Sequence, residues 1–176
     1  MVPSMNITLA SCSDINEIMG LIESCIKNME SQDIYQWDEY YPTREIIGDD
    51  IENESMHVLK ENGKVIGIIV LNEEQPPEWG HVNWSTREGK ALAVHRLAVD
   101  PKWQNQGIGR RLLDFTEEYA ANKRHTSIRL DTYSGNPRAM KLYEKHGYKR
   151  VGQVHFAKRE LPFYCYEKTL TPKDRN

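Results

Sequence analysis

The segment Val94–Ala120, VHRLAVDPKWQNQGIGRRLLDFTEEYA, limits the possible folds more than any other part of the sequence. It begins as an apolar strand, turns at Gly107 and Gly109, and continues as an amphipathic helix. The hydrophobic pattern predicts a strand over Ala91–Val99 and a helix over Gly107–Lys123. A strand that is joined to a helix by a glycine turn is typical of folds in which helices pack against a β-sheet.

Similar patterns predict the other elements. Further strands are expected at Asn6–Ala10, in a hairpin turning at Asn62-Gly63, and over Thr126–Asp131, Tyr148–Phe156 and Phe163–Leu170. Further helices are expected after an N-cap at Ser13, over Thr43–Asn53 and over Asn136–His146. The order predicts an α/β (α+β) fold, with a mixed sheet, helices on both faces and residues 1–176 in a single domain.

Composition excludes several classes of protein. The chain has 176 residues, of which 39% are hydrophobic and 28% charged, which is typical of a globular protein with a core. A net charge of −3 argues against a nucleic-acid-binding protein. There is no apolar run of about 20 residues and no signal-peptide pattern, so we expect a cytoplasmic protein without membrane association. The three cysteines lack metal-binding spacing and are expected to be buried, reduced thiols.

The glycine turn has the properties of an anion site. The first turn of a helix leaves backbone N–H groups unpaired, and glycines allow a ligand to approach them. Arg110 and Arg111 add positive charge. The sequence matches neither the P-loop nor the dinucleotide-binding pattern. Phosphate or pyrophosphate binding and a helix start without a ligand both remain open.

The residues around the turn resemble a known family. Gln104–Gly109, QNQGIG, fits the Q/R-x-x-G-x-G/A motif of the GCN5-related N-acetyltransferases. A second motif of that family is similar to LDTYSGNPRAMKLYEKHGYKRVG, which follows at Leu130–Gly152. The resemblance covers about Ala91–Val154. It implies a mixed, mostly antiparallel sheet of six to seven strands, splayed at the cofactor site and flanked by about four helices.

The resemblance also implies acetyl-CoA as the cofactor. The backbone of the strand at Leu97 and Val99 is expected to pair with pantetheine, and the N–H groups of Gln104–Arg110 to hold the pyrophosphate. The implied cofactor-binding residues are Leu97, Ala98, Val99, Gln104, Asn105, Gln106, Gly107, Ile108, Gly109, Arg110 and Asn136. Asn136 also suits a plain helix N-cap, and both roles remain open.

Two residues are candidates for catalysis. By resemblance, Tyr143 gives a proton to the leaving thiolate, although it also suits a packed aromatic. Ala93 stands where some members of the family have a glutamate that acts as the general base. Strand alternation would place Ala91, Ala93, His95, Leu97 and Val99 on one face, with His95 as the titratable group. Arg96 is expected to point the other way, toward a carboxylate beneath a helix.

His95 is therefore the candidate general base, and a structural histidine is the alternative. Asp38, Glu39, His81 and an ordered water chain are further candidates for the base. No metal site is expected. The absence of a cysteine from the glycine motif favours direct transfer over an acetyl-cysteine relay.

The sequence does not identify the acceptor. The aromatic, acidic segment Asp33–Pro42 favours a small cationic amine, or else ties a helix to the sheet. The segment with Trp79, His81 and Trp84 is a candidate lid. We expect an N-acetyltransferase that acts on a primary amine, as a monomer or homodimer. A peptide or protein N-acetyltransferase and a non-catalytic acyl-CoA-binding module are the alternatives.

Overall fold

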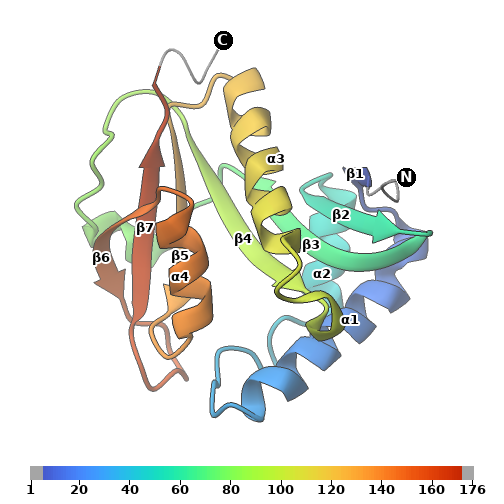
Figure 1. Ribbon diagram of the computed structural model, residues 1–176. Helices are drawn as coiled ribbons and strands as arrows, with labels where there is room; N and C mark the ends of the chain where they lie inside the picture. Colours follow the sequence, from blue (N-terminus) through green and yellow to red (C-terminus); the bar gives the residue numbers. More distant parts are fainter. Residues whose placement is uncertain (1–5, 172–176) are drawn as a thin grey trace. The chain divides into compact units, whose positions relative to one another are not determined.

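The computed structural model describes residues 6–171, which form one mixed sheet and its flanking helices (Figure 1). The strands are β1 (Asn6–Leu9), β2 (Met56–Glu61), β3 (Lys64–Asn72), β4 (Ala91–Val99), β5 (Ser127–Tyr133), β6 (Lys149–Val154) and β7 (Phe163–Thr169). The helices are α1 (Ile15–Glu30), α2 (Arg44–Glu52), α3 (Ile108–Asn122) and α4 (Pro137–Lys145). The strand order is β1-β2-β3-β4-β5-β7-β6, so the predicted fold class is confirmed.

The chain forms two compact units, and β4 contributes to both. The first unit contains the described residues up to Leu71 together with Arg96–Leu112. The second contains Asn72–His95 and the described residues from Leu113 onward.

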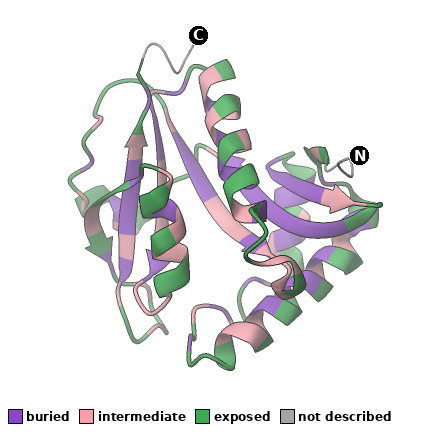
Figure 2. Ribbon diagram, in the orientation of Figure 1, coloured by how far each residue is buried: buried purple, intermediate pink, exposed green. Residues whose placement is uncertain are grey.

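In the first unit, α1 and α2 cover a core built on the β2–β3 hairpin (Figure 2). Ile18, Leu21, Ile22 and Cys25 of α1 are buried there, and their helical spacing places them on one face of the helix. Met56, Val58, Ile68 and Val70 of the hairpin belong to the same core. The predicted hairpin turn is confirmed, with φ of 50° at Asn62 and 80° at Gly63.

The predicted N-cap of α1, Ser13, was one residue early, because α1 begins at Ile15 with Asp14 as its N-cap. Ser13 lies inside a short 3-10 helix, η1 (Cys12–Asp14), and Ser11 precedes that helix as its N-cap. The backbone N–H of Ser11 donates to Asp14 Oδ2 at 2.9 Å, as in a capping box. Thr43, by contrast, caps α2 as predicted and accepts a hydrogen bond from the N–H of Ile46 at 3.2 Å.

In the second unit, β5 pairs with β7 along its whole length, and β7 pairs with β6. Parallel pairing of β4 with β5 extends only from Ala91–Ser127 to Ala93–Arg129, although β5 continues to Tyr133. Beyond Arg129, β5 therefore keeps its partner on the β7 side after its described pairs with β4 have ended.

Candidate active site

The glycine turn lies in the first unit, between β4 and α3. After Val99 the chain passes through a 3-10 helix, η3 (Pro101–Trp103), and α3 begins at Ile108. Asn105, Gln106 and Gly107 are exposed. Gly107 has a φ of +80°, and a Cβ built at this position would have no neighbour within 4 Å. Glycine is thus favoured here by its backbone conformation, and the space beside it is open.

A second glycine sets the position of this turn. A Cβ on Gly67 of β3 would lie 3.1 Å from Leu112 Cδ1 and 3.2 Å from Ile108 Cγ2. The missing side chain lets the first turns of α3 approach β3 closely. The start of α3 is therefore fixed by packing against the sheet of the first unit.

Arg96 interrupts the regular geometry of β4. Its φ of +48° is left-handed and uncommon for a non-glycine residue in a strand. The expected single face from Ala91 to Val99 is consequently broken at this residue. The guanidinium donates to both oxygens of Asp50 in α2 at 2.7 Å, which confirms the predicted pairing with a carboxylate beneath a helix. It also donates to the Tyr41 hydroxyl at 3.0 Å.

Tyr143 lies in the second unit, on the buried face of α4. Its ring centroid is 6.1 Å from that of Tyr148 and 6.0 Å from that of Tyr166. Burial, followed by the charge of Asp131 and the neighbouring Tyr166, raises the pKa of Tyr143 above its ordinary value. The hydroxyl is therefore protonated at neutral pH and can act as a proton donor.

Asn136 is the N-cap of α4. Its side chain accepts a hydrogen bond from the N–H of Ala139 at 3.2 Å, and Pro137 occupies the first helical position. The capping role that the sequence left open is thus present. The cofactor-binding role of Asn136 stays a prediction.

His95 has well-defined partners in the second unit. Its Nε2 lies 2.9 Å from Asn72 Oδ1 and 3.0 Å from the carbonyl oxygen of Glu74. Both partners are acceptors, so Nε2 carries the hydrogen. The ring stacks on Trp79, with centroids 6.2 Å apart and an interplanar angle of 11°.

The tryptophans of the candidate lid are buried. Trp79, in the 3-10 helix η2 (Pro77–His81), is 2% exposed and Trp84 is 8% exposed. Trp84 Nε1 donates to the carbonyl oxygen of Trp79 at 3.1 Å. The idea that these rings cover an acceptor from a lid is therefore wrong: they anchor the segment, while His81 is exposed.

Sequence reasoning did not assign a role to Asp131. Trp79 Nε1 donates to Asp131 Oδ2 at 2.7 Å. Burial, followed by the nearby charge of Glu78, raises the pKa of the Asp131 carboxyl to about 6 despite this hydrogen bond. A carboxylate at the end of an apolar strand, within the second motif, was the available sequence signal.

The aromatic segment of the first unit has mixed roles. Trp37 is buried in the core, as expected for a residue that ties a helix to the sheet. Tyr35 and Tyr40 are exposed, as is Glu39. Asp38 forms a local bridge with Tyr41. Of these aromatic rings, only the tyrosines remain available to an acceptor.

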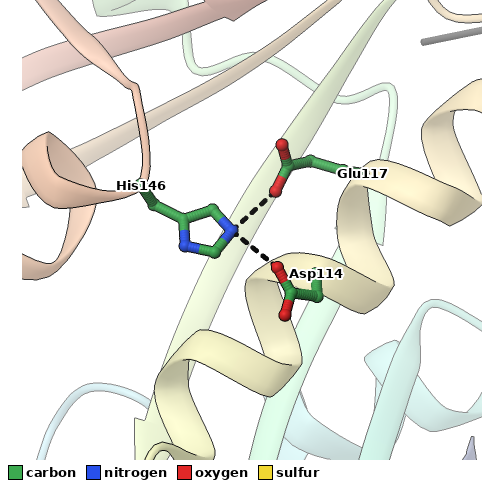
Figure 3. Close-up of side chains that lie close together, drawn as sticks. All are labelled: Asp114, Glu117 and His146. Atoms are coloured by element: carbon green, nitrogen blue, oxygen red, sulfur yellow. Dashed lines mark ion pairs between the residues drawn. The ribbon is translucent and has the colours of Figure 1, made fainter.

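Asp114, Glu117 and His146 form another cluster of titratable side chains in the second unit (Figure 3). His146 Nε2 lies 3.0 Å from Asp114 Oδ1 and 2.7 Å from Glu117 Oε2. Lys168 Nζ donates to Glu117 and, at 2.9 Å, to the carbonyl oxygen of His146. Because an ammonium group already neutralises Glu117, we interpret the cluster as an ion-pair network that joins α3, α4 and β7.

The cysteines are free thiols in different environments. Cys25 and Cys165 are buried, as predicted, but Cys12 is exposed. Burial is the main cause that raises the pKa of both Cys25 and Cys165 to about 12, so neither is a ready nucleophile. Among the helices within residues 6–171, none is long and apolar enough to span a membrane.

Comparisons with known proteins agree with these observations. The sequence model of the Acetyltransferase (GNAT) family matches residues 17–148, and the chain therefore belongs to this acetyltransferase family. An uncharacterized N-acetyltransferase of Bacillus subtilis, YesJ, is 26% identical over 90% of this chain and 86% of its own length. An S-alkylcysteine N-acetyltransferase of the same organism is 25% identical over 80% of this chain and 76% of its own.

Solved structures support the same assignment. A GNAT-family acetyltransferase from Streptococcus agalactiae has a TM-score of 0.83 and 25% identity, with 95% of this chain and 96% of that chain covered.

Proposed function

We propose that this protein transfers an acetyl group from acetyl-CoA to the primary amine of a small acceptor, by direct transfer. The observation that carries the proposal is the exposed turn at Gly107, which has open space beside it and lies in the segment with the family motif. A phosphate group can approach the backbone there without meeting a Cβ.

The cofactor-binding residues follow from this turn. The backbone N–H groups of Gln104–Arg110 bind the pyrophosphate, and the backbone of Leu97–Val99 binds pantetheine. The exposed guanidinium of Arg110 adds positive charge. Acetyl-CoA supplies the acetyl group as a thioester.

Two side chains of the second unit handle the protons. His95 takes a proton from the acceptor ammonium as the general base. Tyr143 holds its proton at neutral pH and donates it to the departing thiolate. No thiol is required as a carrier, in keeping with the raised pKa values of the buried cysteines.

The acceptor is most simply an amino-acid-like amine. The similar B. subtilis enzyme is named for an S-alkylcysteine, whose nitrogen is a primary amine. The proposal extends this chemistry, and not that particular substrate, to the present chain. A peptide N-terminus carries the same functional group and belongs in the test as a competing acceptor.

The test measures thiol release from acetyl-CoA with S-methylcysteine, a polyamine and a short peptide as acceptors. We expect release with at least one small amine and less with the peptide. CoA binding without release for any amine would favour a non-catalytic acyl-CoA-binding module.

A glycine variant tests the pyrophosphate site. Gly107→Val places a branched side chain at a φ of +80° and in the path of the ligand, so CoA binding measured by calorimetry should be lost. Gly20→Ala is the matched control, because Gly20 lies on the exposed face of α1 and its added Cβ meets nothing within 4 Å. Unchanged affinity in the Gly107 variant would place the pyrophosphate elsewhere.

A further inference from the structure

The carboxylate of Asp131 accepts a hydrogen bond from a single donor. Trp79 Nε1 holds Oδ2 at 2.7 Å. Within residues 6–171, the side chain of Asp131 has no further hydrogen bond and no ion pair. Half-buried carboxylates of folded proteins are usually paired with a cation or with several N–H groups, so this one lacks the expected compensation.

The charged and titratable neighbours of Asp131 do not neutralise its negative charge. Glu78 of η2 has the same sign and acts on it electrostatically. Tyr143 of α4 and Cys165 of β7 also interact with it, and both are neutral at physiological pH. The charged side chain that acts on this carboxylate is therefore another carboxylate, which repels it.

The carboxylate is also held rigidly. Trp79 is almost fully buried, and its ring packs against Trp84 at a centroid distance of 5.1 Å and against His95 at 6.2 Å. Because the Trp79 ring is packed on two sides, its Nε1–H group points in a fixed direction, toward Asp131. Asp131 is thus oriented before any ligand arrives, which lowers the entropic cost of binding.

Asp131 lies just beyond the point where β4 and β5 stop pairing. The last described pair is Ala93 with Arg129, two residues before Asp131. On the opposite side β5 still pairs with β7, where Asp131 faces Cys165. Asp131 therefore stands on a part of β5 whose pairing with β4 has already ended.

We propose that Asp131 binds the ammonium group of the acceptor and makes the enzyme prefer amines that are positively charged, with Trp79 as its positioning residue. This inference rests on the proposed acetyltransferase activity. The ammonium supplies the cation that the carboxylate lacks, and Glu78 strengthens the attraction at longer range. His95 keeps its separate role as proton acceptor.

The experiment compares two acceptors in the wild type and in Asp131→Asn. S-methylcysteine has an ammonium group at neutral pH, whereas the nitrogen of O-methylhydroxylamine is uncharged. Asparagine keeps the acceptor for Trp79 and removes the charge. We expect kcat/KM for S-methylcysteine to fall at least about tenfold, mainly through KM, because a hydrogen bond to a charged group is lost. For O-methylhydroxylamine it should change less than about threefold.

Controls separate the possible failures. Glu118→Gln removes an exposed carboxylate of the same unit and should leave kcat/KM unchanged for both S-methylcysteine and O-methylhydroxylamine. Glu78→Gln, which leaves the Trp79 contact in place, should weaken S-methylcysteine about threefold and is the second measurement if Asp131→Asn does not fold. CoA affinity should be equal in all variants.

Equal losses for both acceptors, or no loss for the charged one, would overturn the role of Asp131 while leaving the acetyltransferase activity intact. A wild type that releases no thiol with any amine would overturn both proposals.

Discussion

At the scale of single residues, Tyr143 and Tyr148 form a pair that separates chemistry from packing. Both are buried tyrosines of the second unit, 6.1 Å apart between ring centroids. The hydroxyl of Tyr148 is buried and has no hydrogen-bond partner within residues 6–171. The two hydroxyl groups can thus be removed one at a time from similar surroundings.

Tyr143→Phe should lower kcat about a hundredfold or more and leave CoA affinity nearly unchanged, because general acid catalysis contributes factors of that size. Tyr148→Phe should leave kcat unchanged and keep or slightly raise the melting temperature, since an unsatisfied buried hydroxyl is removed. Steady-state kinetics and thermal melts provide both readouts. Similar losses of kcat in the two variants would mean that Tyr143 acts through packing.

Asp131 links function to stability through pH. Its pKa is raised from an ordinary value of 3.8 to about 6, mainly by burial. A raised carboxyl pKa favours the protonated form in the folded state, so its stabilising contribution is present below about pH 4 and lost as pH rises through 6. At pH 8 the ionised group destabilises the fold.

Asp131→Asn should therefore raise the free energy of unfolding at pH 8 by about 1 to 3 kcal/mol, from about 1.4 kcal/mol per unit of pKa. At pH 4 the gain should nearly vanish. Urea unfolding at the two pH values measures this difference, and a gain that does not depend on pH would contradict the raised pKa.

At the scale of elements, β4 is held by the ion pair between Arg96 and Asp50. Both side chains are largely buried, with side-chain exposures of 13% and 9%, and the contact is bidentate. Removing one partner leaves a buried charge without compensation.

Arg96→Ala should accordingly cost about 3 kcal/mol in the free energy of unfolding. The double variant Arg96→Ala/Asp50→Ala should cost less than the two single variants summed, because no unpaired charge remains. Chemical denaturation of the four proteins tests this. Strictly additive losses would show that the pair contributes little as a pair.

Elements of this chain could be predicted from the sequence because their signals are local. The bounds of β4 were predicted without error, and α4 was expected at Asn136–His146 and found at Pro137–Lys145. The left-handed conformation at Arg96 has no signal in the neighbouring sequence, and its ion-pair partner Asp50 lies far away along the chain. The hydrogen bond of Trp79 likewise joins it to a residue far away in the sequence, Asp131, 52 positions further along the chain.

The candidate site was predictable to a different degree. The glycine turn and Tyr143 were expected because sequence motifs mark them. Asp131 was not, because a single aspartate at a strand end carries no information about its partners. The missing cation becomes visible only when the surroundings of the carboxylate are known in three dimensions.

At the scale of the whole molecule, the cysteines report on how tightly each of the two units is packed internally. Cys12 is exposed, whereas Cys25 in the first unit and Cys165 in the second are buried thiols with pKa values of about 12. In the native protein, one thiol should react quickly with a disulfide reagent and two only on unfolding. A spectrophotometric thiol titration, with and without denaturant, measures both groups. A second fast thiol would show that one unit opens readily.

Gly67 takes no part in the chemistry, yet it sets how near the first turns of α3 come to β3. A methyl group at this position would push Ile108 and Leu112 outward and displace the glycine turn that we propose binds the pyrophosphate. A genetic screen for inactive variants should therefore find substitutions of Gly67 as well as substitutions of residues proposed to contact the substrate. Glycine would then be required at this position for ligand affinity.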